Sequence, residues 1–185
     1  MTCIVGLEQD GVVYIGGDSA GTDPSFNIHS RKDEKVFRVG KSMLVGYTTS
    51  FRMGQLLRYS YRPPKRSEKK SEMEYLVSDV MDSIRKLFST KGFLSKDKDS
   101  DVGGTFLLGY NSHLYIIEED FQVGRSINGY DACGCGSKYA LGAMHVTKDM
   151  VLDPETRIRK ALDSATHHSA AVRPPYTILT LGQKK

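Results

Sequence analysis

The sequence predicts an α+β fold in which two β-sheets stack face to face between two layers of helices, a four-layer α/β/β/α sandwich. Strand-like segments come in consecutive blocks, and helix-like segments come in pairs after each block. The chain does not show the regular alternation of strands and helices that would indicate a parallel α/β sheet. With 185 residues, of which 39% are hydrophobic, it is expected to form a single domain over residues 1–185.

The two blocks of strands are defined by short β-rich segments. The first block is predicted at residues 2–8, 12–15, 35–39 and 42–48. Its first two segments are joined by Asp10 and Gly11, a pair typical of a hairpin turn. The segment that ends at Lys32 is largely polar, and no strand is predicted there. The second block and the final strand are predicted at residues 105–110, 113–117, 122–125, 131–133 and 176–181.

Two pairs of helices separate these strands. They are predicted at residues 50–61 and from 71 onward, and at residues 137–146 and 153–168. The second helix begins with Ser71 and Glu74, which have the spacing of a capping box. The last helix begins with Asp153 as N-cap and Pro154 at the first helical position. Residues 91–104 are polar and are interpreted as an exposed, mobile loop.

Composition and charge exclude several classes of protein. The net charge of +4 is modest, and basic and acidic residues are mixed along the chain. We therefore expect no nucleic-acid partner. No segment approaches the roughly 20 apolar residues of a membrane span, and residues 1–6 do not resemble a signal peptide. An odd number of cysteines argues against a disulfide framework and fits a reducing compartment. We therefore expect a cytoplasmic protein without a membrane partner.

Thr2 is the most informative candidate for chemistry, because a strand that begins there presents its side chain at the end of a sheet. Removal of Met1 would leave Thr2 with a nucleophilic hydroxyl and an α-amine of pKa ~7.7–8.0 that can accept the hydroxyl proton. Taken alone, Thr2 is more simply interpreted as the first residue of a strand. The surrounding segments favour the chemical interpretation.

Three segments carry a resemblance to a known family, at residues 2–6, 12–20 and 132–142. They resemble proteasome β-type subunits and, more closely, the bacterial proteasome-like peptidase of the heat-shock-locus V type. The resemblance extends through the last helix and strand. It implies a threonine-type endopeptidase with the N-terminal-nucleophile hydrolase fold and no cofactor. It also implies a homo-oligomeric ring that receives unfolded polypeptide from an ATPase partner ring.

The same resemblance assigns two residues beside Thr2. Asp18 lies at the family spacing of the catalytic-site Asp, and Lys35 resembles the active-site Lys, reached through a slightly longer loop. A buried Lys35 would stabilise the Thr2 alkoxide and lower the proton affinity of the amine. Asp18 would keep Lys35 charged and fixed. Taken singly, Asp18 is also compatible with a turn residue and Lys35 with a solvated strand end.

The segment before the first helix departs from the family, which has a pair of glycines where this chain has Thr49 and Ser50. Backbone N–H groups in such a turn can stabilise an oxyanion, so the Thr49 N–H is the oxyanion candidate. By resemblance, Tyr47 and Phe51 shape the pocket for the residue that precedes the cleaved bond. An apolar preference at that position follows as a hypothesis.

Cys135 stands where the family usually has Ser, and Ser137 is a second auxiliary candidate nearby. A thiol is a weaker hydrogen-bonding group than a hydroxyl, which weakens a role in proton relay. No metal site is expected, because Cys133 and Cys135 lack further ligands of suitable spacing. The Asp and Ser that proteasome subunits carry after their last helix have no clear match in residues 167–175.

Two alternatives to the peptidase stay open. The departures at Thr49 and Cys135 fit a catalytically inactive proteasome-like ring or scaffold protein. The remaining alternative is an N-terminal-nucleophile amidase that acts on a small amide, with Thr2 as nucleophile or, after removal of both Met1 and Thr2, with Cys3.

Overall fold

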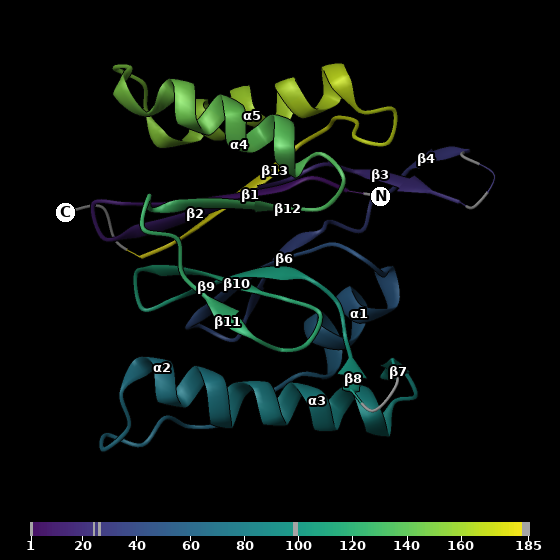
Figure 1. Cartoon of the computed structure of the whole chain (residues 1–185), viewed down its shortest axis with the longest axis vertical. Helices are drawn as coiled ribbons and strands as arrows, with labels where there is room; N and C mark the ends of the chain where they lie inside the picture. Colours follow the sequence, from purple (N-terminus) through teal and green to yellow (C-terminus); the bar gives the residue numbers. More distant parts are fainter. Residues whose placement is uncertain (1, 24, 26, 98–99, 183–185) are drawn as a thin grey trace.

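Two antiparallel sheets lie at the centre of the structure, one above the other, with helices on the outer face of each (Figure 1). The computed structural model describes every residue except 1, 24, 26, 98–99 and 183–185. The predicted four-layer α/β/β/α sandwich is confirmed. Each predicted block of strands is divided between the two sheets: the strands predicted at residues 2–8 and 12–15 lie in one sheet, and those predicted at 35–39 and 42–48 lie in the other. Helices cover the outer face of each sheet and bury its apolar side chains.

The upper sheet contains the N-terminal strand in an interior position. Its strands, in spatial order, are β12 (Tyr130–Cys133), β1 (Ile4–Gln9), β2 (Val12–Gly17) and β13 (Thr177–Leu181). The helices α4 (Ser137–Val146) and α5 (Pro154–His168) cover its outer face (Figure 1). Helix α5 has the predicted start, because the Asp153 side chain accepts from the Thr156 N–H and Pro154 occupies the first turn.

The lower sheet contains five strands. They are, in spatial order, β11 (Val123–Gly124), β10 (His113–Ile117), β9 (Phe106–Tyr110), β6 (Met43–Tyr47) and β5 (Val36–Val39). Its helices are α1 (Phe51–Gln55), which continues with π-helical geometry as η1 (Leu56–Ser60), and the continuous run α2 (Glu72–Glu74), η2 (Tyr75–Val80) and α3 (Met81–Thr90). The predicted capping box of Ser71 and Glu74 is formed. A short helical turn, η3 (Thr147–Asp149), follows α4.

The sheets pack directly on each other through apolar side chains that include Ile4 and Ile15 of the upper sheet and Leu44 of the lower. A Cβ at Gly46 would lie 2.6 Å from Cγ2 of Ile4 and 2.7 Å from Cγ2 of Ile15. Only a glycine therefore allows the two sheets to approach so closely at this point. No helix in the described part of the chain is long and apolar enough to cross a membrane.

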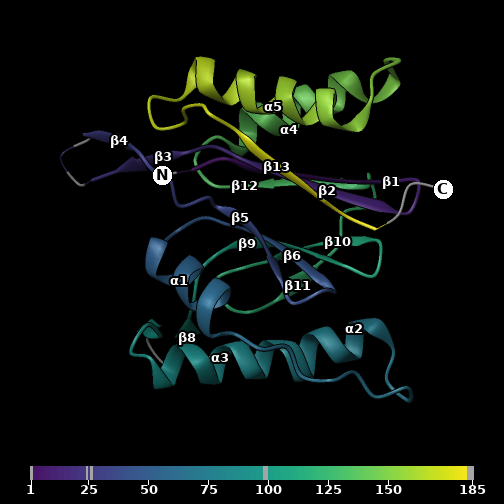
Figure 2. The same cartoon turned by 180° about the vertical axis from the view of Figure 1, so that it is seen from behind.

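Two hairpins correct the sequence interpretation. The strands β3 (Ala20–Thr22) and β4 (Ile28–Ser30) pair with each other and extend away from the sandwich (Figure 2). They were missed because all three residues of β4 are exposed, so no alternation of apolar and polar residues marks the strand. The strands β7 (Ser95–Asp97) and β8 (Ser100–Val102) likewise replace the expected loop, of which residues 98–99 lie outside the described part.

Glu8, on β1, joins the two sheets through its carboxylate. The carboxylate accepts a hydrogen bond from the backbone N–H of Leu114 at 2.7 Å and from Nη2 of Arg125 at 2.8 Å. Partial burial alone would raise the pKa of Glu8, but the hydrogen bonds from Arg125 and Leu114 together lower it below its ordinary value of 4.5. The ionised form of Glu8 is therefore the one that stabilises the fold.

Replacing Glu8 by glutamine is expected to reduce the free energy of unfolding by about 1 kcal/mol near neutral pH. Because the folded pKa lies below 4.5, the contribution of Glu8 is present above that pH and is lost as the pH falls through the folded value. The difference between wild type and variant should thus shrink in acid. Urea unfolding at about pH 7 and about pH 3 measures it, with the exposed Glu119→Gln as control. An equal difference at both pH values would contradict the role given to Glu8.

Candidate active site

Thr2 lies just before β1 and is almost completely enclosed, with 5% of its surface exposed. Its carbonyl oxygen accepts from the Gly136 N–H at 3.3 Å and from the Cys135 thiol at 3.4 Å. Gly134 makes this approach possible, because it has φ +94° and a Cβ there would lie 2.2 Å from the Thr2 carbonyl oxygen. The turn between β12 and α4 therefore wraps around the backbone of Thr2.

Asp18 follows β2, and the register of the sheet explains its place beside the start of the chain. Ile4 is paired with Gly17, so Cys3 and Asp18 face each other across the strand ends. The Asp18 carboxylate accepts from the Cys3 N–H at 3.0 Å and from Lys35 Nζ at 2.8 Å through one oxygen. Its other oxygen accepts from the N–H groups of Ala20 at 3.0 Å and Arg173 at 3.4 Å. Four donors thus hold the carboxylate in one orientation.

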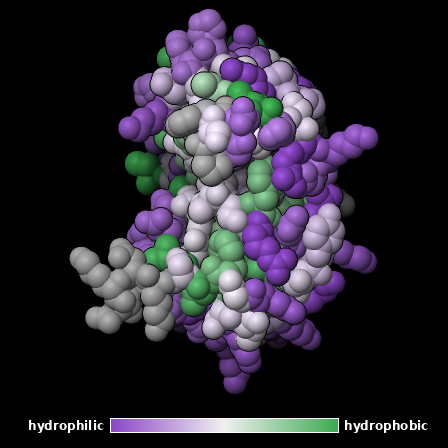
Figure 3. All heavy atoms as spheres, turned by 90° about the vertical axis from the view of Figure 1, so that its right-hand side faces the viewer, coloured by the Kyte–Doolittle hydropathy of each residue, from purple (hydrophilic) through white to green (hydrophobic). Residues whose placement is uncertain are grey.

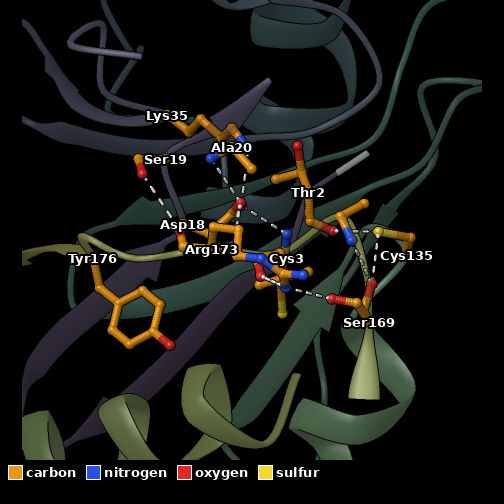
Figure 4. A network of polar contacts seen from close by, with 12 residues as sticks. Thr2, Cys3, Asp18, Ser19, Ala20, Lys35, Cys135, Ser169, Arg173 and Tyr176 are labelled. Atoms are coloured by element: carbon orange, nitrogen blue, oxygen red, sulfur yellow. Dashed lines mark hydrogen bonds and ion pairs between the residues drawn. The ribbon is translucent and has the colours of Figure 1, made fainter. Parts of the chain in front are cut away.

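Lys35 comes from the lower sheet, directly before β5, and is 2% exposed. Burial lowers the pKa of Lys35, while the adjacent Asp18 carboxylate acts in the opposite direction. Figure 4 shows Thr2 between the Lys35–Asp18 pair and Cys135. The structure therefore brings together the three residues assigned by the sequence, Thr2, Asp18 and Lys35. A lysine with a lowered pKa beside a threonine is suited to stabilising an alkoxide.

The auxiliary candidates lie on the other side of Thr2. Cys135 is exposed, and its sulfur also lies 3.7 Å from the hydroxyl oxygen of Ser169 (Figure 4). Ser137 begins α4, where its N–H donates to the Gly134 carbonyl at 3.1 Å. Ser169 was missed in the sequence. It ends α5 as the C-cap, within residues 167–175, where the sequence showed no clear match to the Ser that proteasome subunits carry after their last helix.

Thr49, the oxyanion candidate, adopts φ +62°. This left-handed conformation suits glycine and costs a β-branched residue roughly 1–3 kcal/mol. The Thr49 hydroxyl offsets part of that cost, because it accepts from the Thr105 N–H at 3.2 Å and lies 3.2 Å from the Thr48 hydroxyl. The turn before α1 therefore has the backbone conformation of a glycine turn although its residue is threonine.

The proposed pocket residues contact each other but differ in exposure. Tyr47 is 4% exposed, and its ring meets the half-buried Phe51 edge to face at 6.0 Å. The guanidinium of Arg31 lies over the Phe51 ring at 3.9 Å. Tyr47 also lines a cavity of about 60 Å³ together with the charged residues Asp33, Glu34 and Arg58 among others. These groups mix aromatic and charged character, so the apolar preference stays a prediction.

Cys3 is fully buried, and burial followed by the nearby Asp18 charge raises the pKa of its thiol. In the chain that carries Thr2, this neutral, enclosed thiol is a poor nucleophile. Among the described residues, no group of three or more His, Cys, Asp or Glu side chains could hold a metal ion.

One face of the molecule is of mixed polarity. Figure 3 shows the face from which β3 and β4 project, at the right-hand side of Figure 1. Apolar and neutral surface runs down the middle of this face, with hydrophilic surface on both sides (Figure 3). Such a face offers both apolar and polar contacts to an extended chain.

Comparison with known proteins identifies the fold. No protein-family model matches the sequence, and no curated protein matches it. Among solved structures, BPH from Thiobacillus denitrificans in complex with Epoxomicin is 20% identical, with a TM-score of 0.82 and 98% of each chain covered. The same protein in another structure, described without Epoxomicin, gives 19% identity and a TM-score of 0.78.

A eukaryotic HslV, from Trypanosoma brucei, is also similar. It is 16% identical, with a TM-score of 0.70, and the match covers 98% of this chain and 100% of that one. At such low identity the likeness concerns the arrangement of the elements rather than individual residues. The chain therefore has the N-terminal-nucleophile hydrolase fold of the proteasome-like peptidases.

Proposed function

We propose that this protein is a subunit of a proteasome-like threonine endopeptidase whose nucleophile is Thr2, freed by removal of Met1. The observation that carries the proposal is the buried Lys35–Asp18 pair beside the enclosed Thr2. Burying an ion pair is costly and is weak evidence for stability as such. A lysine with a lowered pKa next to an N-terminal hydroxyl has a clear chemical use.

In the proposed reaction, Oγ1 of Thr2 attacks the peptide carbonyl and the free α-amine of Thr2 takes its proton, directly or through one water. Lys35 stabilises the forming alkoxide and favours the unprotonated amine. The C–N bond then breaks, the amine of Thr2 returns the proton to the departing nitrogen, and an ester remains on Oγ1. Water hydrolyses this ester by the same proton route and regenerates Thr2.

The Thr49 N–H is the proposed donor to the oxyanion, in a turn that already has the required left-handed conformation. The Cys135 thiol acts on the backbone of Thr2 rather than on its hydroxyl, because it donates to the Thr2 carbonyl. In this proposal Cys135 therefore helps to place Thr2, and an auxiliary proton relay through it is not required.

The proposed function also implies a class of substrate and an assembly of subunits. We propose an unfolded polypeptide as substrate, cleaved after an apolar residue next to Tyr47 and Phe51. The subunits form a homo-oligomeric ring in the cytoplasm and receive substrate from an ATPase ring. Size-exclusion chromatography with light scattering tests the assembly independently of activity.

Epoxomicin is the most direct probe of the proposed nucleophile, because a similar fold has been solved with it. An epoxyketone has two electrophilic carbons, so it reacts durably with a residue that carries both a hydroxyl and a free amine. We expect the intact mass to show loss of Met1 and a covalent adduct located on Thr2. Thr2→Ala should give no adduct, whereas Thr2→Ser, which keeps both groups, should still react. Retention of Met1 in the protein from its source cell would refute the proposal.

The alternative is an inactive ring or scaffold protein, favoured by threonine in a left-handed turn and by Cys135 beside Thr2. One sample distinguishes the peptidase from the scaffold protein. Assembled rings that have lost Met1 but form no adduct with Epoxomicin would support the scaffold function.

A further inference from the structure

The side chain of Arg173 closes the C-terminal end of α5. Its Nη1 donates to three backbone carbonyls, of Thr166 at 3.4 Å, Ser169 at 3.0 Å and Val172 at 2.7 Å. Carbonyls at the end of a helix lack intrahelical partners and carry partial negative charge. A guanidinium satisfies several of them at once and is therefore suited to fixing the segment that follows α5.

This segment, residues 169–173, touches the proposed site at both of its ends. At one end the Arg173 N–H donates to Asp18 at 3.4 Å, and the Arg173 carbonyl accepts from the Ser19 N–H at 3.0 Å and its hydroxyl at 3.3 Å. At the other end Ser169 lies 3.7 Å from the Cys135 sulfur, which itself donates to the Thr2 carbonyl. The segment thus spans the site from Asp18 to Cys135 (Figure 4).

The other hydrogen bonds within the segment are long. The Ala171 N–H reaches the Ser169 hydroxyl at 3.4 Å, and the Val172 N–H reaches the Ser169 carbonyl at 3.4 Å. Ala171 and Val172 are buried, and Val172 packs in the apolar cluster formed by the upper sheet and the helices α4 and α5. This packing keeps the segment attached to the fold. Burial of these two residues does not by itself bring the polar atoms of the segment to hydrogen-bonding distance from Asp18 and Cys135. The Arg173 side chain makes the shortest of these contacts, at 2.7 Å to the Val172 carbonyl.

We propose that Arg173 is a positioning residue for the Thr2 site. It holds residues 169–173 so that Asp18 and Cys135 keep their places on either side of Thr2. The role rests on the proposed peptidase function, but the placement of the segment does not. The contact between the Arg173 N–H and Asp18 is long enough that a shift of a fraction of an ångström removes it.

The test compares Arg173→Gln and Arg173→Lys with the exposed Arg159→Gln on α5, which loses only an ion pair to Glu155. At saturating Epoxomicin, Arg173→Gln should form the Thr2 adduct about 10- to 100-fold more slowly, with the half-saturating concentration unchanged. Arg173→Lys keeps a cation that can reach the carbonyls, so its rate of adduct formation should lie between those of wild type and Arg173→Gln. Arg159→Gln should behave as wild type.

Hydrogen exchange at the backbone N–H groups of Ser19, Ala20 and Arg173 gives a readout that needs no activity. We expect faster exchange at these positions in Arg173→Gln and unchanged exchange in the β9–β10 hairpin. If wild type forms no adduct, the proposed function fails and the exchange data alone decide. Local acceleration then supports the placement role, and unchanged exchange overturns it.

Three further results would overturn the proposal. Wild-type adduct rates together with wild-type exchange in Arg173→Gln would show that the segment needs no guanidinium. Faster exchange throughout the chain would show a role in global stability alone. A rate for Arg173→Lys as low as that of Arg173→Gln, with folding intact, would show that the cation does not position the site.

Discussion

Replacing Lys35 by methionine is expected to slow the reaction of Thr2 with Epoxomicin by about 10²- to 10³-fold and to reduce stability by about 3–5 kcal/mol. The reactivity falls because the buried cation beside Thr2 is lost. The stability falls because methionine cannot donate the hydrogen bond that Lys35 Nζ makes at 2.8 Å to the buried carboxylate of Asp18, which is 2% exposed. Adduct formation by mass spectrometry and urea unfolding measure the two effects separately.

Lys41→Met is the matched control, because Lys41 lies exposed in the turn at the other end of the same hairpin. It should leave both measurements unchanged. Wild-type reactivity in Lys35→Met would remove Lys35 from the mechanism. A loss of stability without loss of reactivity would leave the ion pair a purely structural one.

The pH dependence of the wild type gives a second check on Lys35. Burial lowers its pKa in the folded state below the ordinary value of 10.5, so the unfolded chain binds more protons between the two values. The contribution of Lys35 to the free energy of unfolding therefore rises as the pH rises from its folded-state pKa to 10.5. Reactivity of Thr2 should fall over the same range, because Lys35 loses its charge there. Lys35→Met should show neither trend.

Gly134→Ala is expected to damage the site through the backbone rather than through charge. The new Cβ would lie 2.2 Å from the Thr2 carbonyl oxygen and 2.9 Å from its carbon, at φ +94°. Both neighbours are main-chain atoms of Thr2, so relief of the clash must change the position of the turn relative to Thr2. We expect a loss of at least about 2 kcal/mol in stability and slower adduct formation.

Gly142→Ala provides the control for this substitution. Gly142 lies in α4, and a Cβ there meets no atom within 4 Å. The same change should stabilise the protein by about 0.5–1 kcal/mol, because alanine favours a helix over glycine. Thermal unfolding compares the two variants. If Gly134→Ala matches wild type in stability and reactivity, the turn between β12 and α4 does not hold Thr2 as described.

Local signals predicted much of the architecture. The capping box at Ser71 and the Asp153–Pro154 start of α5 are formed because the atoms involved lie within one turn. The convergence of Thr2, Asp18 and Lys35 was also predicted, although by resemblance and not from local pattern. Their catalytic roles stay predictions until the adduct is measured.

Other features depend on contacts that no local pattern records. The left-handed backbone of Thr49 contradicts the preference of threonine and exists because the turn before α1 requires it. Arg173 reaches the site mainly through backbone atoms, so its side-chain type carried no signal of its place. In the β3–β4 hairpin all three residues of β4 are exposed, so this strand lacks the periodicity by which strands are recognised.

The interior position of β1 has a consequence for the order of events during synthesis. Thr2 is synthesised before the groups that surround it, which come from the residue after β2, the residue before β5, the β12–α4 turn and Arg173. A partly synthesised chain that lacks Arg173 cannot assemble this environment in full, because Arg173 follows all of the other groups along the chain. We therefore expect the complete arrangement around Thr2 to form only after Arg173 has been added to the chain.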